Sequence, residues 1–162
     1  GNTIKEFSSL QEEVLSPSTS YVVTDLLKTV VDKGTGGSAR WKYKFSAPAA
    51  GKTGTTQGFS DAWFVGYSPH LVAGVWFGVD DYSISLGNKQ DGSRAALPVW
   101  ARFMREAYKT LNLKHSDFNM PKNIKSIEIC SETKKMPSKL CLTENEIFID
   151  GTQPSDMCKN HK

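Results

Sequence analysis

Residues 50–56 carry the side chains of an anion-binding site on an extended strand. They read Ala-Gly-Lys-Thr-Gly-Thr-Thr, so that one lysine, three threonines and two glycines lie within seven positions. Glycine lets a ligand approach the backbone, threonine supplies hydroxyl groups, and lysine supplies a positive charge. This combination suits a carboxylate on an extended ligand. The residues that we predict to bind substrate are Lys52, Thr53, Gly54, Thr55 and Thr56.

A phosphate-binding loop is the first alternative for this stretch. That motif needs a glycine five residues before Gly51, where this chain has Ser46, and it needs a helix that begins at the lysine. Poor helix formers follow Lys52 instead, and then a turn. We therefore interpret the stretch as a strand and not as a nucleotide site. The residues of the turn that we expect to rim the binding groove are Gln57, Gly58 and Phe59.

The apolar pattern on both sides of the strand predicts an α+β fold. Ser16-Pro17 predicts the start of a helix, with serine as the N-cap and proline in the first turn, and Gly34 predicts its end. Strands are expected over residues 61–67 and 71–79, both covered on both faces, and a second helix over 95–111. The expected fold class is three antiparallel strands with flanking helices and an extended C-terminal tail.

Aromatic residues divide into an expected core and an expected surface. Trp63, Trp76 and Trp100 lie in apolar runs, so we place them in the core. Residues 38–48 mix basic and aromatic side chains, and because this cluster is short and isolated we interpret it as a solvated loop. The mixed pattern over residues 3–7 indicates an edge strand.

The character of the chain changes at about Lys114. Residues 114–162 have dispersed charge, several prolines and all three cysteines, and this composition indicates a tail or appendage. Short strands are expected there over residues 124–129 and 146–149. We accordingly divide the chain into a domain over residues 1–113 and an appendage over 114–162.

The three cysteines suit a disulfide better than a metal site. Cys141 and Cys158 flank a loop with glycine, threonine and proline, which fits a disulfide in an oxidising compartment, and Cys130 has no evident mate. The cysteine spacing does not match a two-cysteine zinc knuckle, and the three histidines are scattered. We therefore expect no metal and no cofactor in this chain.

Composition excludes two other classes of partner. The formal net charge is only +3 and its basic residues are dispersed, so we expect no nucleic acid. No apolar run approaches the roughly 18 residues of a membrane span, and we expect none in this chain. The chain opens on Gly1-Asn2 without a signal peptide, so we expect any anchor to lie in sequence upstream.

Four runs extend the Lys-Thr-Gly triplet into a resemblance to a known family. Lys-Thr-Gly is one of three motifs of penicillin-binding proteins and class A β-lactamases. The runs occur in the order 50–56, 61–67, 73–76 and 94–100. Together they resemble the C-terminal part of the transpeptidase domain of class A (bifunctional) penicillin-binding proteins. The run from Cys141 to His161 resembles the C-terminal tail of that family, so the resemblance covers nearly the whole chain.

The resemblance implies a serine β-lactamase/transpeptidase-like fold and a peptidoglycan D,D-transpeptidase. In that family a serine attacks a stem peptide that ends in D-alanyl-D-alanine, and the amine of a second stem peptide resolves the acyl-enzyme. β-Lactams imitate the same peptide. The resemblance makes Lys52 a catalytic residue as well as a substrate-binding one. It also implies the periplasmic, extracytoplasmic face of a bacterial inner membrane.

The chain departs from the family pattern in one respect. The family places Ser-x-x-Lys and Ser-x-Asn before Lys-Thr-Gly, but neither precedes Lys52. The one Ser-x-x-Lys, Ser131 to Lys134, follows it in a polar region and is interpreted as coincidence. We expect this chain alone to be inactive and to need an upstream half with the nucleophile. The alternatives are a D,D-carboxypeptidase or β-lactamase-like hydrolase, and a non-catalytic cell-wall peptide-binding module.

Overall fold

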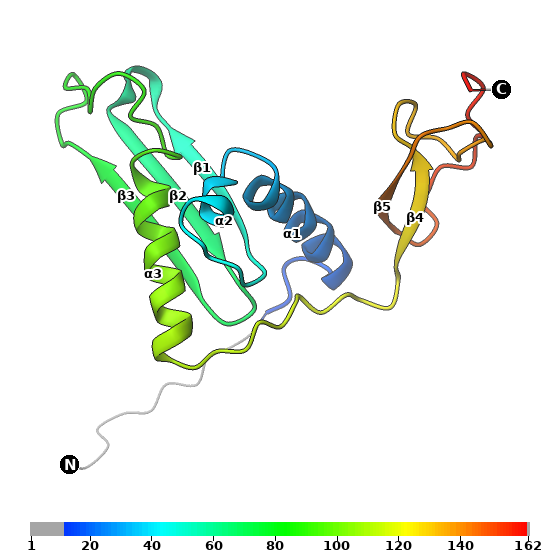
Figure 1. Cartoon of the computed structure of the whole chain (residues 1–162), viewed down its shortest axis with the longest axis horizontal. Helices are drawn as coiled ribbons and strands as arrows, with labels where there is room; N and C mark the ends of the chain where they lie inside the picture. Colours follow the sequence, from blue (N-terminus) through cyan, green and yellow to red (C-terminus); the bar gives the residue numbers. More distant parts are fainter. Residues whose placement is uncertain (1–11, 162) are drawn as a thin grey trace, which may run out of the picture.

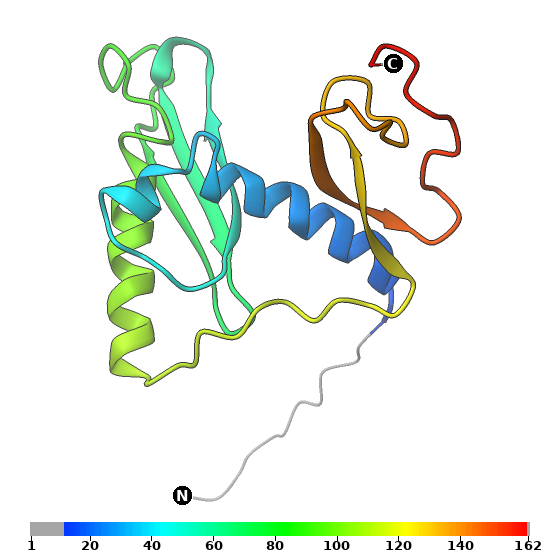
Figure 2. The same ribbon diagram turned by 45° about the vertical axis from the view of Figure 1, so that its right-hand side comes forward.

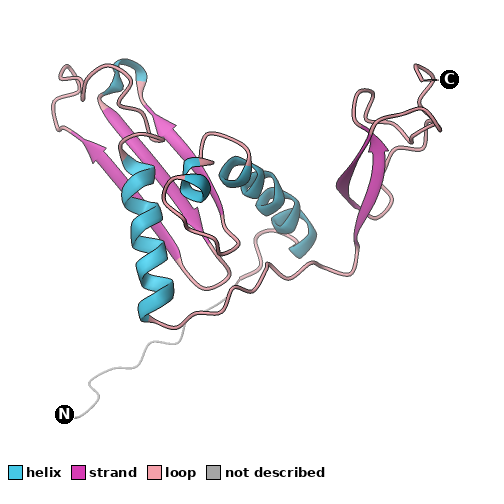
Figure 3. Ribbon diagram, in the orientation of Figure 1, coloured by secondary structure: helices cyan, strands magenta, loops and turns pink. Residues whose placement is uncertain are grey.

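The computed structural model describes residues 12–161, and its elements confirm the expected α+β class (Figures 1 and 3). The first part contains α1 (Pro17–Asp32), α2 (Ser38–Trp41), β1 (Ala50–Thr55), the 3-10 turn η1 (Gln57–Phe59), β2 (Asp61–Tyr67), β3 (Val72–Gly78) and α3 (Ala96–Thr110). A long loop then leads to β4 (Ile124–Cys130) and β5 (Thr143–Ile149). The edge strand expected over residues 3–7 lies outside the described residues.

β1, β2 and β3 form an antiparallel sheet in chain order, as the short connections between them predicted. Lys52 lies opposite Val65, and Trp63 lies opposite Trp76. Because side chains alternate along a strand and cross-strand partners share a face, these four side chains lie on one face and Phe64 lies on the other. In the described part of the chain, β1 and β3 are the two edges of this sheet.

α3 covers the Phe64 face of the sheet through Trp100. The ring centroids of Phe64 and Trp100 lie 4.8 Å apart, and Trp100 Nε1 donates to the carbonyl oxygen of Gly66 at 3.2 Å. A Cβ atom on Gly66 would lie 2.7 Å from Cζ2 of Trp100, so glycine is needed for the indole to reach the strand. Each fully buried apolar side chain in such a core contributes about 1.5–3 kcal/mol.

α1 begins where the sequence predicted and lies alongside β1 (Figure 2). The hydroxyl oxygen of Ser16 accepts a hydrogen bond from the Thr19 N–H at 3.2 Å, and Pro17 occupies the first turn. Farther along the helix, the hydroxyl groups of Thr24 and Tyr67 lie 3.0 Å apart and form a hydrogen bond. That bond attaches α1 to the end of β2, so helix and sheet form one unit.

The second face of the sheet is open, contrary to expectation. Trp63, Val65 and Trp76 are 44%, 47% and 47% exposed, whereas Trp100 is fully buried. Placing all three tryptophans in the core was therefore wrong for Trp63 and Trp76. A continuous apolar run indicates a strand that is buried on both faces. In the described residues, however, the side chains of Trp63, Val65 and Trp76 remain about half-exposed.

The basic and aromatic stretch over residues 38–48 is only partly a solvated loop. α2 occupies its first four positions, and Phe45 is 2% exposed in the core beside Trp100. The Arg40 guanidinium donates through Nη1 to the carbonyl oxygens of Phe45 and Ala47 at 2.9 and 2.6 Å. Arg40 Nε pairs with Asp32 at 2.8 Å. Arg40 thus uses its charge to hold this stretch against the core.

A loop without helix or strand runs over residues 111–123 and joins α3 to β4 (Figure 3). Lys28 of α1 forms an ion pair with Asp117 at 3.0 Å, and Ser18 Oγ donates to Asn123 Oδ1 at 2.8 Å. Partial burial raises the pKa of Asp117, but hydrogen bonds from Lys28 and from a backbone N–H outweigh it, so the pKa lies below its usual value. The loop is therefore attached to α1 at two points.

β4 and β5 form a separate antiparallel pair after this loop. The strands expected over residues 124–129 and 146–149 are both present, and β5 begins three residues earlier than expected, at Thr143. The domain boundary expected between residues 113 and 114 stays a prediction. Among residues 12–161, no helix combines the length and the apolar character that a membrane crossing requires.

Candidate active-site strand

β1 presents a row of free backbone groups at its outer edge. The Thr56 N–H donates to the Asp61 carbonyl oxygen at 3.1 Å, and this bond fixes the alternation of the ladder between β1 and β2. Even-numbered residues of β1 then direct their backbone groups toward β2, and odd-numbered residues direct theirs away. No strand pairs with that outer edge in the described residues. The backbone of Thr53 and Thr55 can therefore pair with an extended ligand.

Lys52 is exposed and brings its charge to the same edge. Its Nζ donates to the carbonyl oxygen of Thr53 at 3.0 Å. At Gly54, the next residue on the Lys52 face, a Cβ atom would lie 3.1 Å from Cβ of Trp63, so glycine allows β1 to pack closely on that side chain. An ammonium group in this position gives the free edge a positive potential. The arrangement suits a ligand that is both extended and anionic.

The hydroxyl groups of Thr53 and Thr55 contact two neighbouring loops. Thr53 Oγ1 lies 3.1 Å from Oγ1 of Thr35, which belongs to the glycine-rich loop after α1. Thr55 Oγ1 accepts a hydrogen bond from the Gly92 N–H at 3.1 Å. A threonine hydroxyl has one proton to donate and two lone pairs, so Thr55 keeps its own proton for a further partner.

The loop before α3 fixes the contact to Thr55. Oδ1 of Asp91 accepts hydrogen bonds from two of the following backbone N–H groups, at 2.9 and 3.0 Å. Gly92 packs so closely on the sheet that a Cβ atom would lie 2.2 Å from the Trp63 carbonyl oxygen and 2.7 Å from that of Gly54. Only glycine permits this approach. The end of β1 is therefore positioned by the same loop that starts α3.

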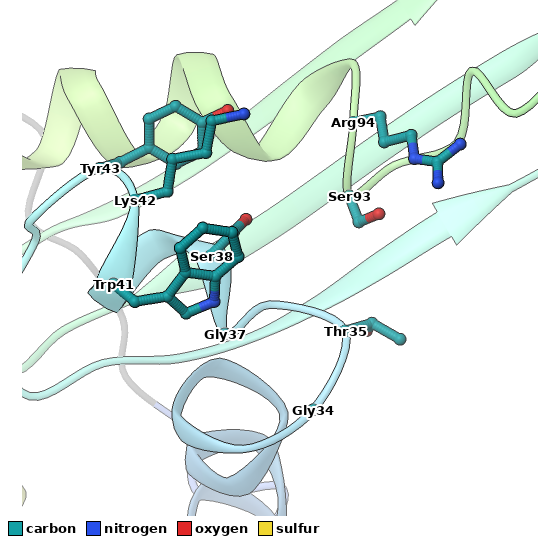
Figure 4. A pocket seen from close by; sticks show the side chains of 9 residues that line it. All are labelled: Gly34, Thr35, Gly37, Ser38, Trp41, Lys42, Tyr43, Ser93 and Arg94. Atoms are coloured by element: carbon teal, nitrogen blue, oxygen red, sulfur yellow. The ribbon is translucent and has the colours of Figure 1, made fainter.

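A pocket of about 540 Å³ lies between the loop after α1 and the loop before α3 (Figure 4). Thr35 lines it and connects it to Thr53 of β1. Both aromatic and cationic side chains contribute to its wall, namely Trp41, Lys42, Tyr43 and Arg94. An anionic ligand on the β1 edge thus has a basic, partly aromatic surface beside it.

The turn expected to rim the groove is η1. Gly58 and Phe59 both have positive φ, at 79° and 58°. Ser85 Oγ donates to the Gly58 carbonyl oxygen at 2.7 Å, and the Leu86 N–H donates to that of Phe59 at 2.7 Å. The loop before α3 therefore holds η1 directly after β1. Contact of Gln57, Gly58 and Phe59 with substrate stays a prediction.

Thr56 and Asp61 contribute to the turn between β1 and β2. Oγ1 of Thr56 accepts a hydrogen bond from the Asp61 N–H at 2.8 Å and lies 2.9 Å from Ser60 Oγ. Asp61 is 5% exposed, and its Oδ1 accepts a hydrogen bond from Trp76 Nε1 at 2.7 Å. These contacts give both residues a structural role. A substrate contact of Thr56 stays a prediction.

Ser131 and Lys134 do not form a nucleophile–base pair. They lie in the turn after β4, where Ser131 Oγ donates to the Leu142 carbonyl oxygen at 3.0 Å and Lys134 pairs with Glu144. The Lys134 side chain is 60% exposed. A lysine base that activates a serine needs a desolvated environment, which this turn does not supply.

Four side chains that the sequence analysis treated separately come together beyond β4. Sγ of Cys130, Cys141 and Cys158 and a ring nitrogen of His161 all lie within 4.8 Å of one another. All three cysteines are free thiols in the structure, which lacks the disulfide expected between Cys141 and Cys158. Cys158 and His161 are only three positions apart, and this close pair is the feature of the sequence that indicates the cluster.

Known families account for most of the chain. Residues 4–105, more than half of it, match the model of the penicillin binding protein transpeptidase domain. The chain belongs to the penicillin-binding transpeptidase family. Residues 120–162 match the model of the penicillin-binding protein 1A C-terminal domain. β1 with its Lys-Thr-Gly triplet thus lies in the transpeptidase part, and β4 and β5 lie in the C-terminal domain.

Relatives of known sequence and structure give the same family. Penicillin-binding protein 1A of Clostridium tetani (strain Massachusetts / E88) and that of Aquifex aeolicus (strain VF5) are each 37% identical over 99% of this chain. The crystal structure of penicillin-binding protein 1A from Haemophilus influenzae matches 90% of the chain at 25% identity, with a TM-score of 0.80. The resemblance to the C-terminal part of a penicillin-binding transpeptidase is confirmed.

The chain spans about a fifth of the length of these penicillin-binding proteins. It covers 21% of each of the two relatives and 22% of the solved chain. Most of such a protein therefore has no counterpart in the present chain.

Proposed function

We propose that β1 is the substrate-binding wall of a peptidoglycan D,D-transpeptidase site, and that an upstream segment of the same protein supplies a nucleophilic serine. The single observation that carries the proposal is the free edge of β1. There, the Lys52 ammonium group donates to the Thr53 carbonyl oxygen and stands beside backbone N–H groups of Thr53 and Thr55 that pair with no strand in the described residues. Membership of the penicillin-binding transpeptidase family supports a ligand that is a stem peptide ending in D-alanyl-D-alanine, or a β-lactam that imitates it.

The stem peptide binds by adding a strand to the β1 edge. Backbone groups of Thr53 and Thr55 pair with the peptide backbone, which fixes its direction and register. The terminal carboxylate of the peptide faces Lys52 and the threonine hydroxyls, which match its charge and its hydrogen-bonding capacity. Lys42 and Arg94 in the adjoining pocket add positive potential without direct contact.

The reaction is acyl transfer through a serine ester. The serine oxygen attacks the carbonyl carbon of the penultimate D-alanine, the peptide C–N bond breaks, and the terminal D-alanine leaves with the proton that its amine takes up. The Thr55 N–H points away from β2 at the free edge, where it can donate to the developing oxyanion. Lys52 assists proton transfer and stabilises negative charge. An amine of a second stem peptide then attacks the ester and forms the cross-link.

The upstream half of the protein completes the site and covers the open face of the sheet. Trp63, Val65 and Trp76 form an exposed apolar face that a second layer of helices buries in an α+β arrangement. No cofactor takes part. The complete protein acts on the extracytoplasmic face of the bacterial inner membrane, where its substrate lies, and an anchor upstream of this chain holds it there.

Labelling with a fluorescent penicillin tests the proposal. The present chain alone should remain unlabelled, and the protein that includes its natural upstream half should be labelled through a serine of that half. Lys52→Ala should abolish labelling of the longer protein, while Lys114→Ala, a substitution of an exposed lysine outside the strand, should not. Labelling of the isolated chain, or an unlabelled longer protein, would contradict the proposal.

The fate of the acyl group separates a transpeptidase from a hydrolase. The longer protein is incubated with a D-alanyl-D-alanine peptide, with and without an acceptor amine, and the products are identified by mass spectrometry. A transpeptidase forms the peptide–amine adduct, and a carboxypeptidase forms only the shortened peptide. Peptide binding without either product would identify a non-catalytic binding module.

A further inference from the structure

The end of β4, the loop after it and the C-terminal segment meet at one point. Cys130 is the last residue of β4, Cys141 lies in the loop before β5, and Cys158 and His161 lie in the C-terminal segment. Figures 1 and 2 both show this segment returning to the loops between β4 and β5. The isolated bridge between Met136 and Met157 aligns the two segments beside the cluster.

The distances from His161 to the three sulfur atoms fit a tetrahedral metal site. Nδ1 of His161 lies 3.6 Å from Sγ of Cys130, 3.4 Å from that of Cys141 and 3.3 Å from that of Cys158. A tetrahedral zinc ion with Zn–S of about 2.3 Å and Zn–N of about 2.0–2.1 Å requires S···N separations of about 3.6 Å. Four such donors around one point are the ligand set of a structural zinc site.

We propose that Cys130, Cys141, Cys158 and His161 bind one zinc ion, which holds the C-terminal unit together. On binding, the three thiols release their protons and coordinate as thiolates, and the imidazole coordinates through Nδ1 as a neutral ligand. The four protein ligands fill the tetrahedral shell and leave no open position for water or substrate, so the zinc is structural and takes no part in catalysis. This inference departs from the sequence-based expectation of no metal.

Contacts around the ligands orient them toward a common centre. His161 Nε2 hydrogen-bonds to Oε2 of Glu132 at 2.8 Å, and this contact holds the ring with Nδ1 toward the three sulfur atoms. A carboxylate on the second nitrogen is a recurrent feature of zinc-bound histidines. The backbone N–H groups of Thr133 and Ser138 donate to Sγ of Cys130 and Cys141 at 3.5 and 3.2 Å. Such N–H···S bonds stabilise the negative charge of a coordinated thiolate.

The unit formed by β4, β5 and the C-terminal segment has only a small apolar core, so a bound metal would add substantially to its stability. Its described residues after the loop include few buried apolar side chains, and two of those are cysteines of the cluster; the set is Ile124, Ile129, Cys130 and Cys158. Units of this size commonly need a metal or a disulfide to fold. A disulfide between two of the cysteines would leave the third thiol and His161 without a shared function. Zinc uses all four and joins three segments.

Metal analysis of the chain of residues 1–162 tests the proposal. Protein purified under reducing, zinc-containing conditions should hold one zinc per chain by elemental analysis and native mass spectrometry. Cobalt(II) that replaces zinc should give the visible absorption of a tetrahedral thiolate site. Cys130→Ser and His161→Ala should each lose the metal, while His115→Ala, the matched histidine control, should keep it. Removal of zinc by a chelator should lower the melting temperature.

The contact between Glu132 and His161 provides a second test. Glu132→Gln should keep one zinc but weaken its binding roughly 10–100-fold, and Glu128→Gln, a substitution of a neighbouring carboxylate on β4, should leave it unchanged. The wild-type cobalt spectrum decides the matter even if the cysteine variants fail to fold. A metal-free wild-type protein with a Cys141–Cys158 disulfide, binding of iron or copper in place of zinc, or octahedral cobalt would each overturn the proposal.

Discussion

The Gly92 N–H donates to Thr55 Oγ1 at 3.1 Å, and this bond ties the loop before α3 to the end of the Lys-Thr-Gly strand. The same loop leads directly into α3, whose Trp100 packs against Phe64 in the core. The position of the proposed substrate-binding edge is therefore set by a loop that is anchored in the folded core. Preorganised geometry of this kind is what acyl transfer requires of its binding groups.

Gly92→Ala tests this dependence. A Cβ atom there meets backbone oxygens of Trp63 and Gly54, so the strands must shift, and we expect slower acylation by penicillin and a loss of ~1–3 kcal/mol in stability. Gly74→Ala is the matched control, since its new Cβ meets only Val65 Cγ2 at an ordinary 3.7 Å. Acylation rates and urea unfolding are measured on the longer protein. Wild-type rates in Gly92→Ala would show that this loop does not position β1.

Lys52→Met separates catalysis from folding. The substitution removes the positive charge at the β1 edge, and we expect the second-order rate constant of acylation to fall by roughly 10²-fold or more in the longer protein. Lys52 is exposed, so the free energy of unfolding should change by no more than about 0.5 kcal/mol. Stopped-flow acylation and urea unfolding check the two parts. A large loss of stability with an unchanged acylation rate would make Lys52 a structural residue.

Phe45→Ala and Trp41→Ala test which side chains of the basic and aromatic stretch over residues 38–48 are buried. Phe45 is 2% exposed and packs on Trp100 and Tyr108, so its truncation should cost about 3–5 kcal/mol. Trp41 is 68% exposed, so its truncation should cost no more than about 0.5 kcal/mol. Thermal unfolding of both variants measures the difference. Similar losses in the two would contradict the burial of Phe45.

Acid should release the loop over residues 111–123. The pKa of Asp117 is lowered in the folded protein, so its contribution to stability is present above the usual aspartate pKa and is lost as pH falls through the lowered value. Because Asp117 is 60% exposed, the contribution is small, about 0.2–1 kcal/mol. Hydrogen exchange in the loop should rise on acidification in the wild type, relative to unstructured peptide standards.

Asp117→Asn should raise exchange in the same loop at neutral pH and remove most of its response to acid. Asp150→Asn, which breaks the exposed ion pair between Lys125 of β4 and Asp150 directly after β5, is the control and should leave the loop unchanged. A loop that exchanges at the same rate in Asp117→Asn and in the wild type would show that the Lys28 ion pair does not hold it.

Local patterns account for the parts of the fold that could be predicted from the sequence. Ser16-Pro17 marks the start of α1 because capping depends on only a few neighbouring residues. The strands around Lys52 follow from short apolar runs and tight turns, and their antiparallel order follows in turn. The free edge of β1 was not predictable in this way, because it depends on which strand pairs with which and in what register.

The features that the sequence did not predict all depend on contacts between distant parts of the protein. Trp63 and Trp76 lie in apolar runs but are about half-exposed, because the cover on each face of a strand depends on which other elements pack against the sheet. Phe45 is flanked by basic residues, and its burial depends on α3, far along the chain. The grouping of Cys130 with His161 depends on the return of the C-terminal segment to β4, which no local spacing encodes.

The tryptophans on the open face of the sheet also make the proposed packing of the upstream half measurable by fluorescence. Trp63 and Trp76 are half-exposed, with ring centroids 6.2 Å apart, whereas Trp100 is already buried. Indole fluorescence moves to shorter wavelength when water leaves the ring, and substitution of the exposed Trp41 by phenylalanine removes the main background. The emission maximum of the remaining tryptophans would then show, without label or substrate, whether the proposed upstream half packs on the sheet.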